Sequence, residues 1–178
     1  MSEVKNIETP ASLASLSLDD SVDEKNIHLL SKEGKKFEIS KRDAKVSDLV
    51  SKSFETDTES TELPLPSVET EMLELIVEYM KYHKGEEPPI VEKPLRSSIM
   101  KDVCKDEWDA TFIDKVGDSD LDKLYELIKT ANYMNIKSLL HLGCAKVASK
   151  IKGKPVDEVK KILRYDEVKR EETKEENN

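Results

Sequence analysis

The sequence has few of the residues and motifs by which active sites are recognised. Its five glycines form no P-loop, no Gly-x-Ser-x-Gly turn and no Gly-x-Gly-x-x-Gly nucleotide-binding motif. The three histidines, His28, His83 and His141, show no spacing that singles out a nucleophile–base pair. An enzymatic function therefore has no positive support, and we predict that the protein is not an enzyme.

Metal and cofactor sites also lack support. His141 and Cys144 lie three residues apart and could face one metal ion, but two ligands do not make a closed site. Cys144 falls on an apolar stripe, where a buried core cysteine is the more common outcome. Paired carboxylates such as Glu86-Glu87 lie in polar loops, without the burial that shifts the pKa of a catalytic acid. We predict no metal and no cofactor.

The chain also lacks disulfide and membrane signals. Two cysteines in different contexts make no disulfide framework, which indicates a reducing compartment. No apolar run approaches the roughly 20 residues that span a bilayer. The N-terminus has neither a basic region nor an apolar region of the kind found in secretory signals. We expect a soluble intracellular protein, in the cytoplasm, the nucleus or both.

Acidic residues outnumber basic ones by 38 to 29, which gives a formal net charge of −9. Such a surface repels phosphate backbones and anionic lipids, so neither nucleic acid nor a membrane is an expected partner. The 178 residues are 37% hydrophobic and 38% charged, which fits one domain with polar tails. We predict a disordered tail over residues 1–25 and a charged tail over residues 166–178.

Two short runs of alternating apolar and polar residues flank Gly34 and predict a β-hairpin with one buried face. Their apolar members are Ile27, Leu29, Phe37 and Ile39. Residues 41–54 suit one or two short helical turns, and residues 55–62 an exposed loop. Residues 63–66, Leu-Pro-Leu-Pro, predict a short edge strand, because proline cannot donate to the hydrogen-bond ladder of a sheet.

Apolar residues at helical spacing predict a strong helix that is capped by Ser67 and ends before Gly85. Its stripe consists of Met72, Leu75, Ile76, Tyr79 and His83. Residues 84–103 resemble a long connecting loop. Trp108 then returns the chain to the core in a short helical segment, as a packing anchor rather than a site.

Three more helices are expected after this segment. The first starts at the Ser-x-x-Asp pattern of Ser119 and the second is capped by Asn135. Gly153 ends the second, and Pro155 fits the first turn of the third. The second has apolar residues on more than one stripe, so its surplus face either packs internally or binds a partner. Without further information, these two interpretations are about equal.

Two runs are the most specific motifs of the chain: Ala131-Asn132-Tyr133-Met134-Asn135-Ile136-Lys137-Ser138-Leu139-Leu140 and Ile151-Lys152-Gly153-Lys154. They closely resemble motifs of the Skp1 family of SCF ubiquitin-ligase adaptors. The similarity extends back through Trp108-Asp109, the Leu-Pro-Leu-Pro segment and the hairpin. It covers roughly residues 26–163, and the motifs are specific in combination.

The resemblance implies an α/β fold, with a BTB/POZ-like domain over residues 26–140 and added F-box-binding helices over residues 141–165. It implies a non-enzymatic adaptor that bridges a cullin and an F-box protein. Asn132 and Tyr133 occupy the family's cullin-contact positions, although Tyr133 on its own would suggest a core aromatic residue. The family's F-box contacts correspond here to Ile128, Leu140, Cys144, Val147, Ile151, Val156, Val159, Ile162 and Leu163.

Two departures from the family pattern affect the C-terminal helices. Family members usually carry Thr-Pro-Glu-Glu after Gly-Lys, whereas Pro155-Val156-Asp157-Glu158 stands here, without the capping hydroxyl. After Leu163 the family continues into a tryptophan-containing helix, and residues 164–178 contain no tryptophan. We therefore expect part of the F-box clamp to be missing and the resemblance to end near Leu163.

Other adaptor readings stay open. An elongin C-like adaptor would bind SOCS-box helices instead, but such chains end near the first helix pair, whereas this one continues beyond Leu140. A divergent paralogue that has lost cullin binding is a further alternative, against which the intact Asn132-Tyr133 pair counts. An enzyme is the remotest reading.

Overall fold

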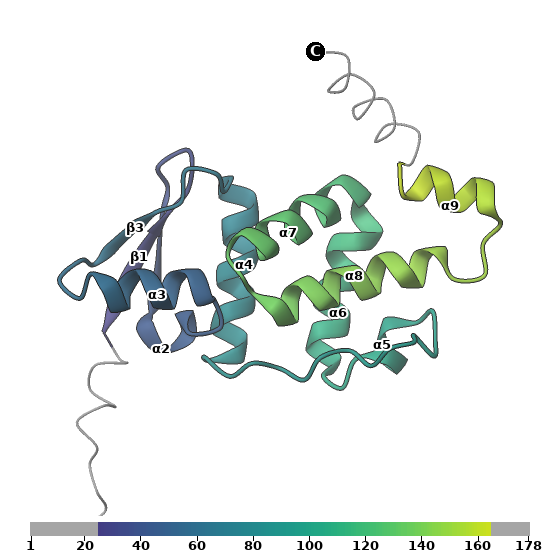
Figure 1. The fold of residues 1–178 in the computed structure, drawn as a ribbon, viewed down its shortest axis with the longest axis horizontal. Coiled ribbons are helices and arrows are strands. Elements are labelled where there is room, and N and C mark those ends of the chain that lie inside the picture. Colours follow the sequence, from purple (N-terminus) through teal and green to yellow (C-terminus); the bar gives the residue numbers. More distant parts are fainter. Residues whose placement is uncertain (1–24, 165–178) are drawn as a thin grey trace, which may run out of the picture.

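The computed structural model describes residues 25–164. A small sheet with two short helices lies at one end, and a bundle of longer helices forms the rest of an elongated molecule (Figure 1). The elements are β1 (Asn26–Leu30), β2 (Lys36–Ser40), α2 (Lys41–Ala44), α3 (Asp48–Thr56), β3 (Glu62–Pro64), α4 (Thr70–His83), α5 (Met100–Val103), α6 (Glu107–Ser119), α7 (Leu121–Tyr133), α8 (Lys137–Ile151) and α9 (Val156–Ile162). The predicted tails lie outside the described residues, apart from the first tail's last residue, Lys25.

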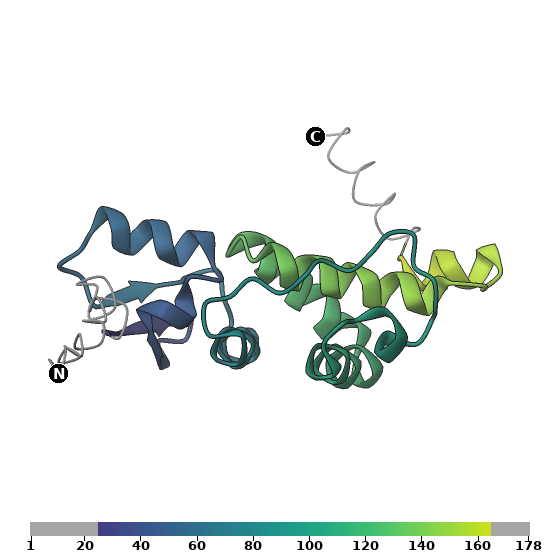
Figure 2. The same cartoon turned by 90° about the horizontal axis from the view of Figure 1, so that it is seen from below.

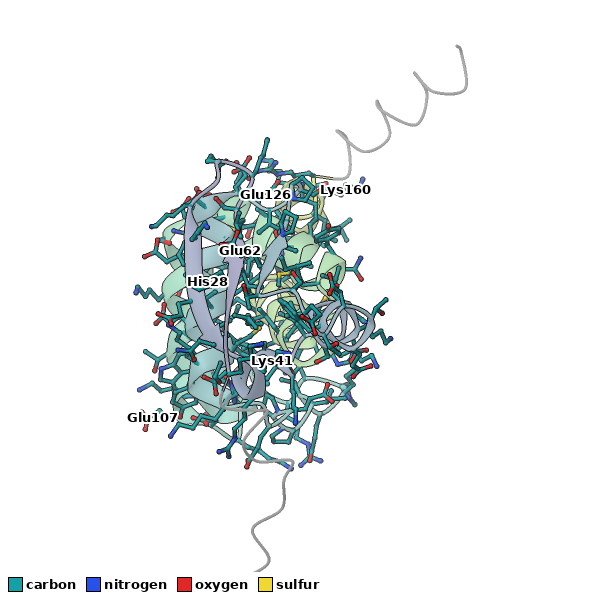
Figure 3. All side chains as sticks on the ribbon, turned by 90° about the vertical axis from the view of Figure 1, so that its left-hand side faces the viewer. His28, Lys41, Glu62, Glu107, Glu126 and Lys160 are labelled. Atoms are coloured by element: carbon teal, nitrogen blue, oxygen red, sulfur yellow. The ribbon has the colours of Figure 1, made fainter. Side chains whose placement is uncertain are left out.

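The sheet confirms the predicted hairpin. β1 pairs antiparallel with β2 and parallel with β3, so the strand order is β2-β1-β3. Ile27 and Leu29 of β1 are buried, and Ile27 lies opposite the buried Ile39. Gly34 adopts a φ of 82° in the turn, a conformation that favours glycine. Figure 3 looks at this end of the molecule, with His28 of β1 beside Glu62 of the edge strand β3.

The first backbone amide of α4, the helix that follows the sheet, is hydrogen-bonded by a side chain that is distant in the sequence. α4 carries the predicted stripe, of which Met72, Leu75, Ile76 and Tyr79 are buried. The predicted cap, Ser67, is wrong, because the helix begins at Thr70 and its N-cap Glu69 makes no side-chain bond. The Thr70 backbone amide instead donates to Glu33 Oε2, 2.8 Å away, in the hairpin turn. A carboxylate distant in sequence therefore replaces a local cap.

The helical half is more regular than the sequence predicted. The short helix α5 interrupts the predicted loop over residues 84–103, and α6 is a full helix rather than a short segment. Asp106 caps α6 by accepting a bond of 2.8 Å from the Trp108 amide. Trp108 is half-buried against the core and stacks on Tyr82 with 3.9 Å between ring centroids. Its predicted role as a packing anchor is confirmed.

Two more predicted caps are wrong. α7 is capped by Asp120, whose side chain accepts from the Asp122 amide, and not by Ser119. α8 has no side-chain cap at all. Asn135 lies just before α8 with a φ of 53°, and its side-chain amide donates to Asp48 Oδ2 at 2.7 Å. Asn135 therefore makes a tertiary contact instead of a capping one.

The sequence placed Cys144 on the buried face of α8, but the structure buries the opposite face of this helix. Its buried residues are Ser138, Leu139, Leu142, Gly143, Ala145, Lys146 and Ser149. Cys144 is exposed, so the core interpretation is wrong. The helix ends at Ile151, and Gly153 follows with a φ of 75°, which confirms the predicted stop.

The close approach of α7 and α8 depends on Gly143. A Cβ atom at this position would lie 2.5 Å from Ile128 Cγ1. Gly143→Ala should therefore lower the free energy of unfolding by about 1–3 kcal/mol, because overpacking forces side chains and backbone to shift. Urea denaturation measures the change. Cys144→Ala, on the exposed side of the same helix, is the matched control and should change stability by less than about 0.5 kcal/mol. Equal stability of the two variants would contradict the predicted clash.

Candidate partner-binding surfaces

The turn between α7 and α8 is anchored to the N-terminus of α3. Met134 is fully buried, and its carbonyl accepts a hydrogen bond of 2.7 Å from the Ser47 hydroxyl. The same carbonyl accepts from the Leu49 amide at 3.4 Å. The Asn135 side chain adds its contact with Asp48. This turn is therefore held to the sheet end of the molecule at several points.

Asn132 and Tyr133 are the last two residues of α7, next to this anchored connection, and we call residues 132–136 the Tyr133 turn. Both are exposed, and 42% of Tyr133 remains accessible to solvent. The alternative in which Tyr133 is a core aromatic residue is therefore wrong. A tyrosine in this position offers an apolar ring and a hydroxyl on a fixed backbone, a combination that is common at protein interfaces.

Sequence reasoning missed the residues that position the turn. Ser47 caps α3 by accepting from the Val50 amide while it donates to Met134. The two residues are separated by 87 positions, so no local pattern connects them. The only local signal is the position of Ser47 before an apolar run, which is typical of an N-cap.

The nine predicted F-box contacts form what we call the outer apolar face: Ile128, Leu140, Cys144, Val147, Ile151, Val156, Val159, Ile162 and Leu163. None of them is buried. Four lie at i, i+4, i+7 and i+11 on α8 and so share one side of that helix. Ile128 of α7 adjoins this side, against Gly143. Val156 is 68% exposed and Leu163 is 43% exposed.

α9 is attached to the rest of the molecule mainly at its far end. It has no buried residue and extends beyond α8 at the edge of the molecule (Figure 2). The Tyr125 hydroxyl of α7 donates to the Ile162 carbonyl, and Arg164 pairs with Asp122. Its N-cap, Pro155, makes no side-chain bond, as expected from the missing threonine. A short helix whose apolar side chains are all accessible is typical of a segment that packs against a partner.

Comparison with known proteins identifies the family. A family model described as the Skp1 family tetramerisation domain, of the POZ type, matches residues 25–85, and the Skp1 family dimerisation domain matches residues 137–178. The S-phase kinase-associated protein 1 homolog of Tetrahymena thermophila is 42% identical over 137 residues, which are 77% of this chain and 80% of the relative. The chain belongs to the Skp1 family.

Other Skp1-family relatives agree. A protein of Arthroderma otae named E3 ubiquitin ligase complex SCF subunit sconC is 36% identical over 77% of this chain and 81% of its own length. SKP1-like protein 12 of Arabidopsis thaliana is 36% identical over 76% of this chain and 81% of its own length. The α/β fold is therefore a BTB/POZ-like fold with added C-terminal helices.

Two details of the family match concern the C-terminal half of this Skp1-family chain. The second match continues to residue 178, so the expectation that the resemblance ends near Leu163 is wrong. The predicted division between residues 140 and 141 lies inside α8, and it remains a prediction.

On its buried side, α8 is joined to α6 by ion pairs. Lys146 Nζ lies 2.7 Å from Asp114 Oδ1 and 2.8 Å from Asp118 Oδ1, and Lys150 Nζ lies 2.9 Å from Asp118. Burial acts to lower the pKa of Lys146, but its hydrogen bonds to Asp114 and Asp118 outweigh burial and raise it. Hydrogen bonds from Lys146 and Lys150 lower the pKa of Asp118. Both shifts show that the pairs favour the charged forms.

Lys146→Met should lower the free energy of unfolding by about 1–2 kcal/mol at neutral pH. The loss is smaller than for a fully buried pair because Asp118 is largely exposed. A lowered carboxyl pKa contributes stability above the unfolded value, here 3.8, and loses it as pH falls through the folded value. The difference in the free energy of unfolding between the wild type and Lys146→Met should therefore become smaller in acid. Urea denaturation at several pH values measures it. Lys101→Met, which breaks only an exposed pair, is the control. A difference that grows in acid would contradict this account.

Within residues 25–164, no three His, Cys, Asp or Glu side chains are placed to hold a metal ion. None of the helices in this part of the chain is long and apolar enough to cross a membrane. Among the described residues, the features that match the sequence predictions for a site are therefore the Tyr133 turn and the outer apolar face.

Proposed function

We propose that this chain is a non-enzymatic adaptor subunit of an SCF-type cullin–RING E3 ubiquitin ligase. In this role it bridges a cullin and an F-box protein, so that substrates carried by the F-box protein are ubiquitinated. The name of the Arthroderma relative, E3 ubiquitin ligase complex SCF subunit sconC, supports the assignment. The structural observation that carries it is the accessibility of both proposed contacts: Asn132 and Tyr133 are exposed, and no residue of the outer apolar face is buried.

The proposed cullin contact consists of Asn132 and Tyr133. Its support is the exposure of both residues on a turn whose backbone is fixed by Ser47 and Met134. A prepositioned aromatic residue loses little conformational entropy on binding, which favours it as an interface anchor. The exposure of Asn132 and Tyr133 also argues against the alternative that this chain is a divergent paralogue which has lost cullin binding.

The proposed F-box contact is the outer apolar face. An F-box is itself a small helical motif, and helices packed on this face would bury apolar area on both partners, at about 25 cal/mol per Å² gross. The chain continues beyond Leu140 through the rest of α8 and into α9. These added helices favour an F-box over the SOCS-box helices of an elongin C-like adaptor.

Gel filtration of co-expressed proteins tests the proposal. The full chain is produced with an F-box fragment and a cullin N-terminal domain, and the three should elute as one complex with each protein in equal amount. Pairwise mixtures should each form a binary complex with the adaptor. The proposal is wrong if neither partner co-elutes, and the elongin C-like alternative is supported if only a SOCS-box fragment does.

A further inference from the structure

A cavity of about 230 Å³ is lined by none of the residues of the two proposed partner surfaces. It opens between α4, α6 and α8 and the segment that leads to α5, which runs alongside α8 in Figure 2. Its lining includes Tyr79, Ile90, Val91, Asp109, Ser138 and Leu142. Lys152 Nζ donates to the carbonyls of Leu95 and Arg96 at 2.7 and 2.6 Å, and so holds the covering segment in place.

Two buried hydroxyl groups in this cavity lack hydrogen-bond partners among the described residues. They belong to Tyr79, which is fully buried, and to Ser138, which is 5% exposed. The Ser138 hydroxyl lies near enough to Tyr79 to act against the rise that burial causes in the Tyr79 pKa, but the two do not bond in good geometry. Buried polar groups are nearly always satisfied in folded proteins, so a pair of them at one cavity calls for a hydrogen-bonding occupant, either water or a ligand that displaces it.

The charge around the cavity favours a cation. The buried Asp109 lines the same cavity and its charge helps to raise the pKa of Tyr79, while its Oδ1 lies 2.9 Å from His83 Nε2. Asp102 and Asp106 add further carboxylates to the lining. The basic lining residues are Arg96, which pairs with Glu92, and Lys105, which is exposed. The negative charge of these carboxylates would stabilise a positive group placed close to the buried Asp109.

The chemistry of the cavity suits binding rather than reaction. Burial, with the nearby Asp109, raises the pKa of the Cys104 thiol to about 11, so the thiol stays protonated and is a poor nucleophile. The volume, about that of eight water molecules, is below the roughly 300–1,000 Å³ of drug-sized sites. The occupant is therefore small.

We propose that this cavity binds a small organic cation, an ammonium or amidinium on a compact apolar body. The cation lies towards Asp109, the Tyr79 and Ser138 hydroxyls bond to the polar group, and Val91 and Leu142 contact the apolar body. The site does not depend on the adaptor role, because none of these residues belongs to the outer apolar face or the Tyr133 turn.

NMR titration of the isotope-labelled full chain tests this site, with benzamidinium as the probe and benzamide as its neutral counterpart of equal shape. Benzamidinium should cause saturable shifts of the amides near Tyr79, Cys104 and Ser138, with a Kd of about 1 mM or below. Benzamide should bind at least about tenfold more weakly, because it lacks the charge.

Variants make the test specific. Ser138→Ala should weaken benzamidinium binding about three- to tenfold, the effect of one hydrogen bond, while the exposed Ser98→Ala should leave it unchanged. Tyr79→Phe, which keeps the ring, replaces Ser138→Ala if that variant does not fold. The proposal is overturned by the absence of saturable shifts at the cavity up to about 10 mM, by equal binding of benzamide, or by unchanged binding in the hydroxyl variant.

Discussion

Val156→Asp should weaken the binding of an F-box protein about a hundredfold while cullin binding is retained. Val156 is the first residue of α9 and is 68% exposed in the free protein, so the fold gains no buried charge. An acidic residue also suits the first turn of a helix. In the complex, the carboxylate would be enclosed by apolar groups without a partner, which costs about 3 kcal/mol, or two factors of ten in Kd.

Isothermal titration with an F-box fragment measures this effect. Thr111→Asp places the same charge on an exposed position of α6 and should leave the affinity unchanged. A circular dichroism melt at matched concentration shows whether α9 and the rest of the fold persist. Unchanged affinity of Val156→Asp would remove the N-terminal end of α9 from the proposed F-box contact.

Tyr133→Ala should reduce cullin affinity about thirtyfold and leave F-box binding unaltered. Truncation of an interface tyrosine often costs about 2 kcal/mol, because it removes a large apolar area from a desolvated contact. The turn itself should persist, since its hydrogen bonds come from Ser47 and from the backbone of Met134 rather than from the tyrosine ring.

Titration of a cullin N-terminal domain, with and without a bound F-box fragment, measures the change. Tyr82→Ala is the matched control, because Tyr82 has a similar exposure of 40% but lies on α4, where it stacks on Trp108. Its cullin affinity should equal that of wild type. Loss of both partners in Tyr133→Ala would mean that the residue supports the fold, and an effect on F-box binding alone would reverse the assignment.

The parts of the fold that depend on local pattern were predictable. The alternation of Ile27 and Leu29 gave one buried face to β1, and the spacing of Met72, Leu75, Ile76 and Tyr79 gave α4 its core face. Both patterns describe elements with a single buried side. In such elements the period of the apolar residues is sufficient to predict type and orientation.

The buried face of α8 was harder to predict, because residues on two different sides of this helix could pack into the core. The outward set, with Cys144 and Val147, is more apolar by sequence than the buried set, which includes Lys146 and two serines. Lys146 can be buried only because Asp114 and Asp118, on α6, neutralise it. A pairing between helices that are distant in sequence leaves no local pattern, so a core role for Cys144 was the wrong inference.

The helix caps show the same limit. Asn135 and Ser67 have suitable side chains just ahead of a helix, yet Asn135 bonds to Asp48 and the start of α4 is satisfied by Glu33. For the candidate site, the residues were named from the family resemblance and their roles stay predictions; the structure adds their exposure. The support that Ser47 gives to the Tyr133 turn is a tertiary contact, which no single stretch of sequence reveals.

The contrast between an anchored turn and a loosely attached α9 has a consequence for how one subunit can serve many substrates. In the proposed ligase, the cullin would always meet the same rigid shape, because Met134 is buried and tied to α3. α9 follows Gly153 and has no buried residue, so in the proposed complex it is the part of the F-box contact that would adjust to F-box sequences of different bulk. Differences among F-box proteins would then be accommodated at α9, while the geometry of the cullin contact at Asn132 and Tyr133 would stay the same.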